Sequence, residues 1–387
     1  PKLAYPFENK SSVKKDIFKD NKVSLSRGSV LRAGFINDAS LIKILPAANI
    51  PVSKEECGQK WNLPENGTIE VSASIIEVKA GEDNILKALS KAKWGDTLEL
   101  CDEGTYFVSS DIFIDFPLEI RASANLKRKP VIQYNGSKKG NIITIRNGGE
   151  LIIKGIAFCG MGVPGKVVPS SGISTLAGMI LPYLLVIDDC EFFDYPEGST
   201  VPVRGLKNTF SQKIIIKNSL FRAISADAIN YAGERDDAGL YNVEELIVEN
   251  CSFNRILGVA INVYRGGSDE STAGPDVNIS NCTYEDVCNK ERGSVLRLVG
   301  AQVLNISGCN FSNSGRSGVS VRLDETTFEK VKIKNCNFWN SGRILTMTGK
   351  VTEGSMLNIK PEYENASAFN YKSKKTSLLY LKNIGVK

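Results

Sequence analysis

The sequence contains no histidine among its 387 residues. This absence excludes Ser-His-Asp and Cys-His hydrolysis, a His-ligated catalytic zinc and an HExxH protease motif. Long hydrophobic runs are also missing. The longest apolar stretch, near Leu176–Ile187, is too short to span a membrane and is interrupted by Pro182. We therefore predict no membrane span.

Neither sign of charge dominates. The 48 Lys and Arg residues against 43 Asp and Glu leave a net charge of +5, which permits an acidic partner but gives no reason to expect a nucleic acid. Hydrophobic residues make up 42% and charged residues 24%, which excludes bulk disorder. The chain begins at Pro1 without Met or an apolar leader, so we expect a processed or partial chain.

One short pattern recurs: a β-branched residue, a polar residue, Asn or Asp, Cys, any residue and an aromatic residue. Its copies and close variants are Ile153–Phe158, Ile187–Phe192, Ile216–Phe221, Val248–Phe253, Ile279–Tyr284, Ile306–Phe311 and Ile333–Phe338. The Cys-equivalent positions are 27 to 34 residues apart. Units of this size cannot bury a core alone, so they must stack on one another.

The repeating unit consists of short β-branched stretches separated by Asn, Gly and Ser, with no helical period between them. This composition predicts strands and tight turns in every unit. Stacked units of this kind form an all-β, right-handed parallel β-helix, in which equivalent residues lie in ladders about 4.8 Å apart. We expect an inward Cys ladder, an inward aromatic ladder and a turn ladder of Asn218, Asn250, Asn281 and Asn335 whose amides bond from coil to coil.

The cysteines fit this arrangement as buried free thiols. Five of the nine occupy the same ladder position, where a small polarizable side chain packs well. A line of thiols is not the tetrahedron that zinc requires. The odd total, with Ser or Ile at two ladder positions, argues against a disulfide framework.

Both ends of the repeat region have recognisable features. Residues 81–100 begin with an apolar helical face that includes Ile85 and Leu89, with Asp83 or Asn84 as the N-cap and Gly95 at the end. A helix placed there would cap the open end of the β-helix. We therefore divide the chain into a lead-in segment (1–74), a β-helix (75–350) and a C-terminal capping tail (351–387).

A second strand follows each Cys-x-aromatic unit and places cations outward. Strand alternation turns Val201 and Val203 inward and Arg204 outward, and the same parity applies on later coils. The outward set, or residues beside it, comprises Arg204, Asn262, Tyr264, Arg265, Arg297, Ser320 and Arg322. Guanidinium groups suit carboxylates or sulfates along a chain, and Tyr can stack on a sugar ring. The alternative is that these arginines are ordinary solvated charges.

An acidic loop supplies another candidate site. Asp227, Glu234, Asp236 and Asp237 lie close together in the sequence and could offer converging oxygens to a calcium ion. A solvated loop without metal is the commoner outcome for such a cluster. The pair Asp236 and Asp237 could also be read as glycoside hydrolase carboxylates, but adjacent strand residues point to opposite faces.

The cap segment Asn84–Leu100, the strands of Gly104–Ala122 and the Cys-x-aromatic coils resemble polysaccharide lyase family 6, which includes alginate lyases and chondroitinase B. The resemblance covers about residues 75–350. It implies a single-stranded, pectate-lyase-like β-helix and a periplasmic or extracellular location. Some members carry two tandem β-helices, and Ser53–Asn62 is similar to the linker that leads into the second. The resemblance therefore implies an upstream catalytic β-helix as a partner.

Lyases of this family cleave uronate chains by β-elimination. A Lys removes the C5 proton, an Arg one coil later assists, and calcium neutralises the uronate carboxylate. Arg322 matches the Arg position best, with Leu323 and Asp324 in place of the family's His-Gly. Gly300 and Ala301 occupy the expected Lys position, and the nearest lysine is Lys290 in a predicted turn.

Two functions follow from this reading. The first is a β-helix module without a complete catalytic site, which binds an acidic polysaccharide such as alginate or a glycosaminoglycan, or supports a lyase. The second is an active lyase with a relocated base, Lys290 or Tyr264, and with Arg297 and Arg322 as carboxylate clamps.

Overall fold

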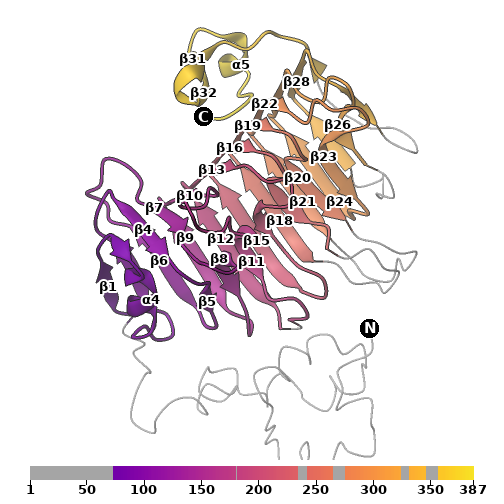
Figure 1. Cartoon of the computed structure of the whole chain (residues 1–387). Coiled ribbons are helices and arrows are strands. Elements are labelled where there is room, and N and C mark those ends of the chain that lie inside the picture. Colours follow the sequence, from indigo (N-terminus) through magenta and orange to yellow (C-terminus); the bar gives the residue numbers. More distant parts are fainter. Residues whose placement is uncertain (1–72, 180, 234–241, 265–274, 324–330, 346–355) are drawn as a thin grey trace, which may run out of the picture. The chain divides into compact units, whose positions relative to one another are not determined.

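Three strands per turn wind into a right-handed parallel β-helix in the computed structural model (Figure 1). The structure describes residues 73–387 except 180, 234–241, 265–274, 324–330 and 346–355. All strand pairs within the three long sheets are parallel, as the repeat predicted. Residues 1–72, most of the predicted lead-in segment, lie outside the described residues.

We call the three sheets A, B and C. Sheet A contains β1 (Ile75–Val78), β3 (Thr97–Leu100), β6 (Leu118–Ala122), β9 (Glu150–Lys154), β12 (Tyr183–Asp188), β15 (Ser211–Lys217), β18 (Val243–Glu249), β21 (Asp276–Ser280), β24 (Val303–Ser307) and β27 (Val331–Lys334). Sheet B contains β2 (Gly81–Glu82), β4 (Thr105–Val108), β7 (Val131–Tyr134), β10 (Ala157–Cys159), β13 (Glu191–Tyr195), β16 (Leu220–Ile224), β19 (Ser252–Ile256), β22 (Thr283–Val287), β25 (Asn310–Ser312), β28 (Cys336–Trp339) and β30 (Met356–Leu357).

Sheet C contains β5 (Ile112–Ile114), β8 (Asn141–Ile145), β11 (Ser171–Thr175), β14 (Val201–Arg204), β17 (Ile229–Tyr231), β20 (Ile261–Tyr264), β23 (Ser294–Val299), β26 (Val319–Arg322) and β29 (Arg343–Leu345). One strand from each sheet makes one coil. Coil 1 is β3 to β5, and coil 9 is β27 to β29. Equivalent positions on successive coils are hydrogen-bonded in register, so each position in a coil becomes a ladder along the axis.

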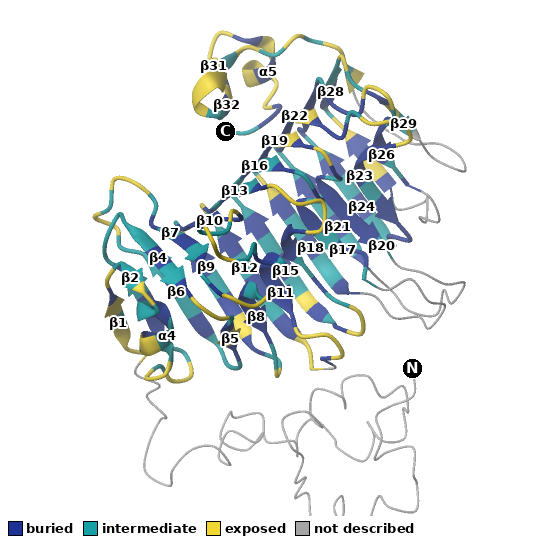
Figure 2. Ribbon diagram, viewed as in Figure 1, coloured by how far each residue is buried: buried dark blue, intermediate teal, exposed yellow. Residues whose placement is uncertain are grey.

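The predicted aromatic ladder forms the centre of the core. Its rings stack from coil 3 to coil 9 with centroids 4.7–5.0 Å apart and planes within 12° of parallel. The members are Phe158, Phe192, Phe221, Phe253, Tyr284, Phe311 and Phe338. This spacing is that of adjacent strands, so each ring stacks on its neighbour without leaving register. The interior is buried along the whole helix (Figure 2).

The cysteine ladder lies at the corner between sheets A and B. Cys190, Cys251, Cys282, Cys309 and Cys336 are all buried, and every described cysteine is a free thiol. Each ladder thiol donates to the carbonyl two residues earlier, for example from Cys251 Sγ to Glu249 O at 3.2 Å. Ser219 makes the same bond at its position, to Lys217 O at 2.7 Å. The prediction of buried free thiols is confirmed for the described residues.

The asparagine ladder is only partly as predicted. Asn218, Asn250, Asn281 and Asn335 all have φ near +53°, in the left-handed region that the sharp corner requires. Asn250 Nδ2 donates to Asn218 Oδ1 at 2.7 Å, which is the expected coil-to-coil bond. Asn335 Nδ2 instead donates to Lys382 O in the tail, at 3.0 Å. The turn conformation is therefore shared by all four residues, while their amide partners differ.

A short helix covers the first coil. Helix α4 (Asn84–Leu89) buries Ile85 and Ala88 against the core, as expected for a cap. It ends six residues before the predicted Gly95. Asp83 has the N-cap position but does not cap with its side chain. Its carboxylate instead accepts from the Ser109 amide and hydroxyl, both at 2.8 Å.

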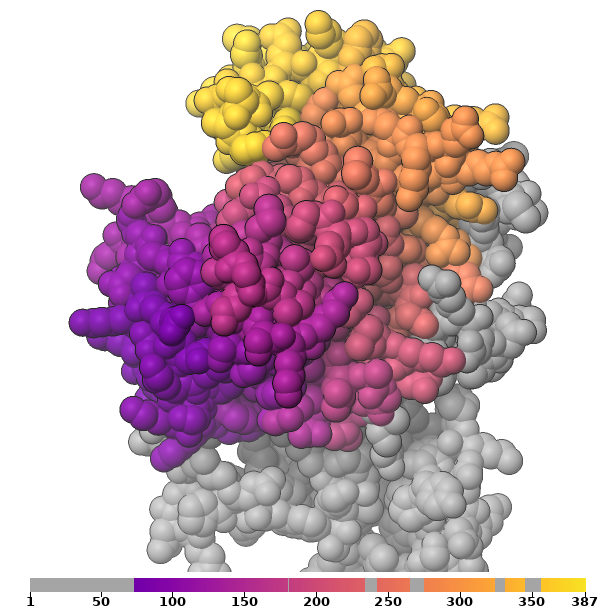
Figure 3. Space-filling view, viewed as in Figure 1, coloured from indigo at the N-terminus to yellow at the C-terminus, as the bar shows by residue number. Residues whose placement is uncertain are grey.

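The C-terminal tail lies against the outer face of sheet B. After β30 it contains β31 (Tyr363–Asn365), the 3₁₀ helix η3 (Ala366–Ala368), β32 (Asn370–Ser373) and α5 (Leu378–Leu381). The Tyr363 hydroxyl donates to Glu285 at 2.7 Å, and Lys387 N donates to Asn250 Oδ1 at 2.7 Å. In the space-filling view the tail forms a raised yellow lobe beside the last coils (Figure 3). Across the described residues, no helix is long and apolar enough to cross a membrane.

Candidate functional site

A column of polar side chains runs along the outer face of sheet C. Register pairing aligns successive members on adjacent strands. From coil 3 to coil 8 the column reads Ser174, Arg204, Asn230, Asn262, Arg297 and Arg322. We call these six residues the sheet C column. The flanking residues Val203, Ile261, Val263 and Val321 are at most 1% exposed, as the alternation predicted. Ser320, which was predicted to face solvent, is instead fully buried, and its hydroxyl donates to Gly342 O at 2.7 Å.

Asp227 organises the middle of the column from the loop before β17. Its carboxylate accepts from Asn230 Nδ2 at 2.8 Å, from Asn262 Nδ2 at 2.9 Å and from Val259 N at 2.8 Å. One carboxylate thus fixes amides on two neighbouring coils. Asn262 is only 8% exposed, so without this acceptor its amide would be a buried donor.

The network continues from the amides to the arginines. Arg297 donates from Nη1 to Asn262 Oδ1 at 3.1 Å, and its guanidinium lies over the Tyr264 ring, 5.0 Å from the centroid. A guanidinium over an aromatic face is stabilised by the ring quadrupole. The predicted binding residues Tyr264 and Arg297 are therefore brought together. Arg322 follows Arg297 in register on the next coil.

Arg204 occupies a different environment at the other end of the column. It is half-buried on β14, and its Nε donates to the Ser174 hydroxyl at 3.4 Å. No carboxylate among the described residues lies within ion-pair distance of it, and burial lowers the pKa of its guanidinium. An arginine nevertheless remains charged at neutral pH. Arg204 is thus a partly desolvated cation that would gain from an anionic ligand.

The catalytic candidates do not form a base site at the expected place. Gly300 has a left-handed φ of +74° at the end of β23, and Ala301 is fully buried. Lys290 is exposed in the turn between β22 and β23, outside the sheet C column. Arg322 lies in the column, but its register partner on the preceding coil is Arg297 rather than a lysine.

The predicted acidic site falls largely outside the described residues, as do Glu234, Asp236, Asp237 and the predicted binding residue Arg265. Asp227 is described, and its carboxylate already accepts three hydrogen bonds from protein groups. The described part of the chain contains no group of three or more Asp, Glu, Cys or His residues that could hold a metal ion. Asp227 by itself does not fit calcium, which takes six to eight oxygens.

Sequence reasoning missed two members of the column and the role of Asp227. Ser174 and Asn230 are uncharged, so the pattern of outward cations does not mark them as members of the column. The signal was present, because "AINYAG" and "AINVYRGG" align Asn230 with Asn262. The bonds from Asp227 to both amides depend on a corner conformation that the residue pattern does not specify.

The fold places the chain in the class of parallel β-helix proteins. Among solved structures, the chain is similar to the PL6 family alginate lyase AlyGC, with a TM-score of 0.64 and 25% sequence identity over 80% of this chain. An arginine-to-alanine mutant of that enzyme matches with a TM-score of 0.62 and 26% identity. The structure is thus related to polysaccharide lyase family 6, as the sequence resemblance indicated.

The match covers only part of the larger enzyme. This chain spans 43% of the length of AlyGC, less than half of that protein. No protein-family model matches the sequence, and the search of curated proteins gives no match either.

Proposed function

We propose that the protein binds an acidic, uronate-containing polysaccharide along the sheet C column. The single observation that carries this proposal is the register alignment of three arginines with two carboxamides on five consecutive coils. Strand spacing repeats the side chains about every 4.8 Å, close to the length of one sugar in an extended polymer. A polyanion lying parallel to the axis would therefore meet one column residue per coil.

The surroundings of Arg204 and Arg297 favour a carboxylate ligand. Arg204 is half-buried and has no acidic partner among the described residues. Arg297 is held between Asn262 and the Tyr264 ring, which fixes the direction of its guanidinium before any ligand binds. Preorganised guanidinium groups bind carboxylates in a charge-assisted and often bidentate way. The similarity to an alginate lyase supports a uronate polymer as the ligand class.

A second candidate function is β-elimination with Tyr264 as the base. The observation in its favour is that Tyr264 lies beneath the Arg297 guanidinium, beside the arginines that would hold a substrate carboxylate. Lys290 is a weaker base candidate because it lies in the turn rather than in the column. Arg297 and Arg322 would hold the substrate carboxylate in this reaction. We rank binding above catalysis because no lysine occupies the expected position.

Affinity electrophoresis in gels containing alginate, chondroitin sulfate, dermatan sulfate, polygalacturonate or heparin tests the binding function. The native protein should be retarded by at least one polymer at low salt and less at high salt, because salt screens exposed charges. Arg297→Ala with Arg322→Ala should strongly weaken the retardation. The matched control, Lys332→Ala with Lys334→Ala, removes two exposed cations from sheet A and should leave it unchanged. Equal loss in both double variants would contradict the column.

Absorbance of unsaturated uronate, followed with the same polymers with and without calcium, tests the second function. A clear rise that Tyr264→Phe abolishes would replace the binding proposal with an active lyase. Calcium and an upstream catalytic β-helix remain proposals that rest on the family resemblance. We propose that the protein acts outside the cytoplasm, in the periplasm or beyond the cell, because a long polysaccharide would be met there.

A further inference from the structure

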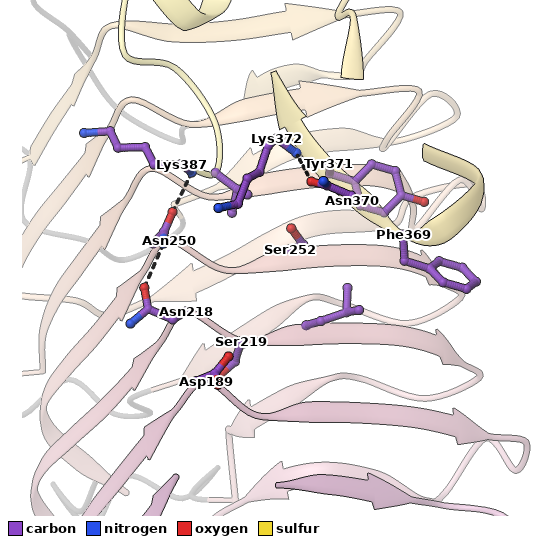
Figure 4. Close-up of a pocket in the computed structure, with 12 residues that line it drawn as sticks. Asp189, Asn218, Ser219, Asn250, Ser252, Phe369, Asn370, Tyr371, Lys372 and Lys387 are labelled. Carbon is purple, nitrogen blue, oxygen red and sulfur yellow. Dashed lines mark hydrogen bonds between the residues drawn. The ribbon is translucent and has the colours of Figure 1, made fainter. Parts of the chain in front are cut away.

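The tail and sheet B enclose a pocket of about 440 Å³ that lies apart from the sheet C column (Figure 4). This volume is within the usual range for small-ligand sites, about 300–1,000 Å³. Its β-helix wall comes from the corner and outer face of coils 4 to 6, and its other wall comes from η3, β32 and the last residues. The lining residues used below are Asn218, Leu220, Asn250, Ser252, Phe369 and Lys372.

Ser252 is the clearest sign of a ligand. The residue is only 6% exposed, and its hydroxyl has no hydrogen-bond partner among the described residues. In Figure 4 the Ser252 oxygen points into the space below Lys372. A hydroxyl that faces an open pocket and has no protein partner can bond a polar ligand in place of water.

The charges around the pocket are unevenly compensated. Asp189, at one edge, is paired with Lys129 at 2.6 Å. Lys372 and Lys387 also line the pocket, and neither ammonium group has a carboxylate partner within the described part of the chain. In Figure 4 the Lys372 ammonium lies among the lining residues, whereas the Lys387 ammonium is directed away from them, so the positive charge of the pocket comes from Lys372. A ligand that carries an anionic group would therefore be favoured over a neutral one.

The remaining lining is typical of a sugar site rather than of a site for a simple anion. Asn218 donates to Asp188 and accepts from Asn250, and the Asn250 oxygen accepts from Lys387 N, so each carboxamide keeps one N–H for a ligand. Leu220 and Phe369 supply apolar walls. Phe369 is itself held by the guanidiniums of Arg222 and Arg255, 4.6 and 5.2 Å from its ring centre. Amides for hydroxyls, an apolar wall for a ring face and a cation for a carboxylate together match a short acidic saccharide.

We propose that this pocket is a second carbohydrate site, which takes one or two sugar units of a uronate oligosaccharide between β19 and the tail. It lies on sheet B, whereas the column lies on sheet C. The two sites can therefore fail or succeed independently. A chain with both sites would hold two stretches of polymer, or a free end and an internal stretch.

Calorimetric titration with a uronate trisaccharide tests the pocket, using the Arg297→Ala, Arg322→Ala protein so that the column does not contribute. Binding should persist in this protein. Adding Lys372→Gln should weaken it about tenfold, equivalent to ~1.4 kcal/mol. Ser252→Val should weaken binding to a similar degree. Because Ser252 is buried, its substitution could also disturb folding, whereas the exposed Lys372→Gln change tests the pocket without that risk. The control Lys375→Gln, an exposed lysine of the tail outside the pocket, should bind normally.

Three results would overturn the proposal. The first is no trisaccharide binding to the column-silenced protein. The second is equal binding by the Lys372→Gln and Lys375→Gln proteins. The third is complete competition by inorganic phosphate, which would indicate a general anion site. A neutral trisaccharide of the same length should bind more weakly than the uronate one. If polymer retardation fails while the trisaccharide binds, the column is wrong and the pocket stands.

Discussion

At the scale of single residues, the cysteine ladder shows why its thiols recur. Cys282 is fully buried, and its Sγ donates to Ser280 O at 3.3 Å, with Val248 O on the preceding coil at 3.7 Å. Ser219 fills the equivalent position with a hydroxyl that makes the same local bond. From coil 4 to coil 9 the position therefore holds a small side chain with a donor and does not require sulfur chemistry, whereas on coil 3 the buried Ile156 fills it.

Cys282→Ser should accordingly be tolerated, with a loss of about 1 kcal/mol or less in the free energy of unfolding, because the hydrogen bond is retained. Cys282→Leu should cost about 1–3 kcal/mol through overpacking. Urea titrations monitored by circular dichroism would measure both. The reverse change, Ser219→Cys, is the control and should be nearly neutral. A large loss for Cys282→Ser would show that the thiol does more than fill this space.

Asp227 supports a second prediction at this scale. Three donors share its carboxylate, so Asp227→Ala should lower the free energy of unfolding by about 1–3 kcal/mol by leaving the Asn262 amide unpaired. Polymer retardation should also weaken, because Asn262 orients Arg297. Asp227→Asn retains an acceptor oxygen and should restore most of the retardation. If both variants bind polymer normally, the Asp227 network is structural only.

At the scale of elements, the strands and corners could be predicted and the tail contacts could not. The Ile-x-Asn-Cys-x-aromatic pattern predicts buried positions and a tight turn, because both depend on residues that are close together in the sequence. The sequence thus predicted the ladders from Cys190 to Cys336. The bond from Tyr363 to Glu285 joins residues 78 positions apart. No local periodicity encodes such a pair, so the sequence placed Tyr363 only in a general capping tail.

The tail gives a prediction about pH. The Tyr363 hydroxyl donates to Glu285 and accepts from Asn310 Nδ2 at 3.0 Å. Burial and the Glu285 carboxylate hold the pKa of Tyr363 well above its ordinary value of 10.0, and burial raises the pKa of Tyr371 to about 12. Since both folded-state values exceed the unfolded one, their stabilisation is complete below pH 10 and is lost as the pH rises from 10 through about 12.

Tail detachment at high pH can be followed by methyl NMR. The signals of Leu379 and Ile384, two buried residues of the tail, should move to unfolded positions at lower pH than those of Ile216 in the β-helix core. Tyr363→Phe should loosen the tail at neutral pH and make the remaining pH dependence shallower. Simultaneous loss of all three signals would mean that the tail and the β-helix unfold as one unit.

At the scale of the whole molecule, the distance between successive coils sets the spacing of every ladder, both in the core and on the surface. The aromatic rings repeat every 4.7–5.0 Å, and the sheet C column must share this spacing because it lies on the same coils. Arg204 and Arg322 are four coils apart, a distance of about 19 Å at the usual strand spacing. The length of the column is therefore set by the number of coils and their spacing rather than by any one side chain.

This fixed length predicts how affinity depends on ligand size. The Lys372→Gln protein, in which binding at the pocket is weakened, isolates the contribution of the column. Its affinity for uronate oligosaccharides should rise with each added sugar until the ligand spans coils 4 to 8, at about five units. Longer chains should gain little. Arg204→Ala should shorten the bound stretch, so that affinity levels off at about four units, which span coils 5 to 8 from Asn230 to Arg322. Isothermal titrations across a length series would measure both limits. Affinity that rises without a plateau, or a plateau that Arg204→Ala leaves in place, would mean that the polymer does not follow the axis.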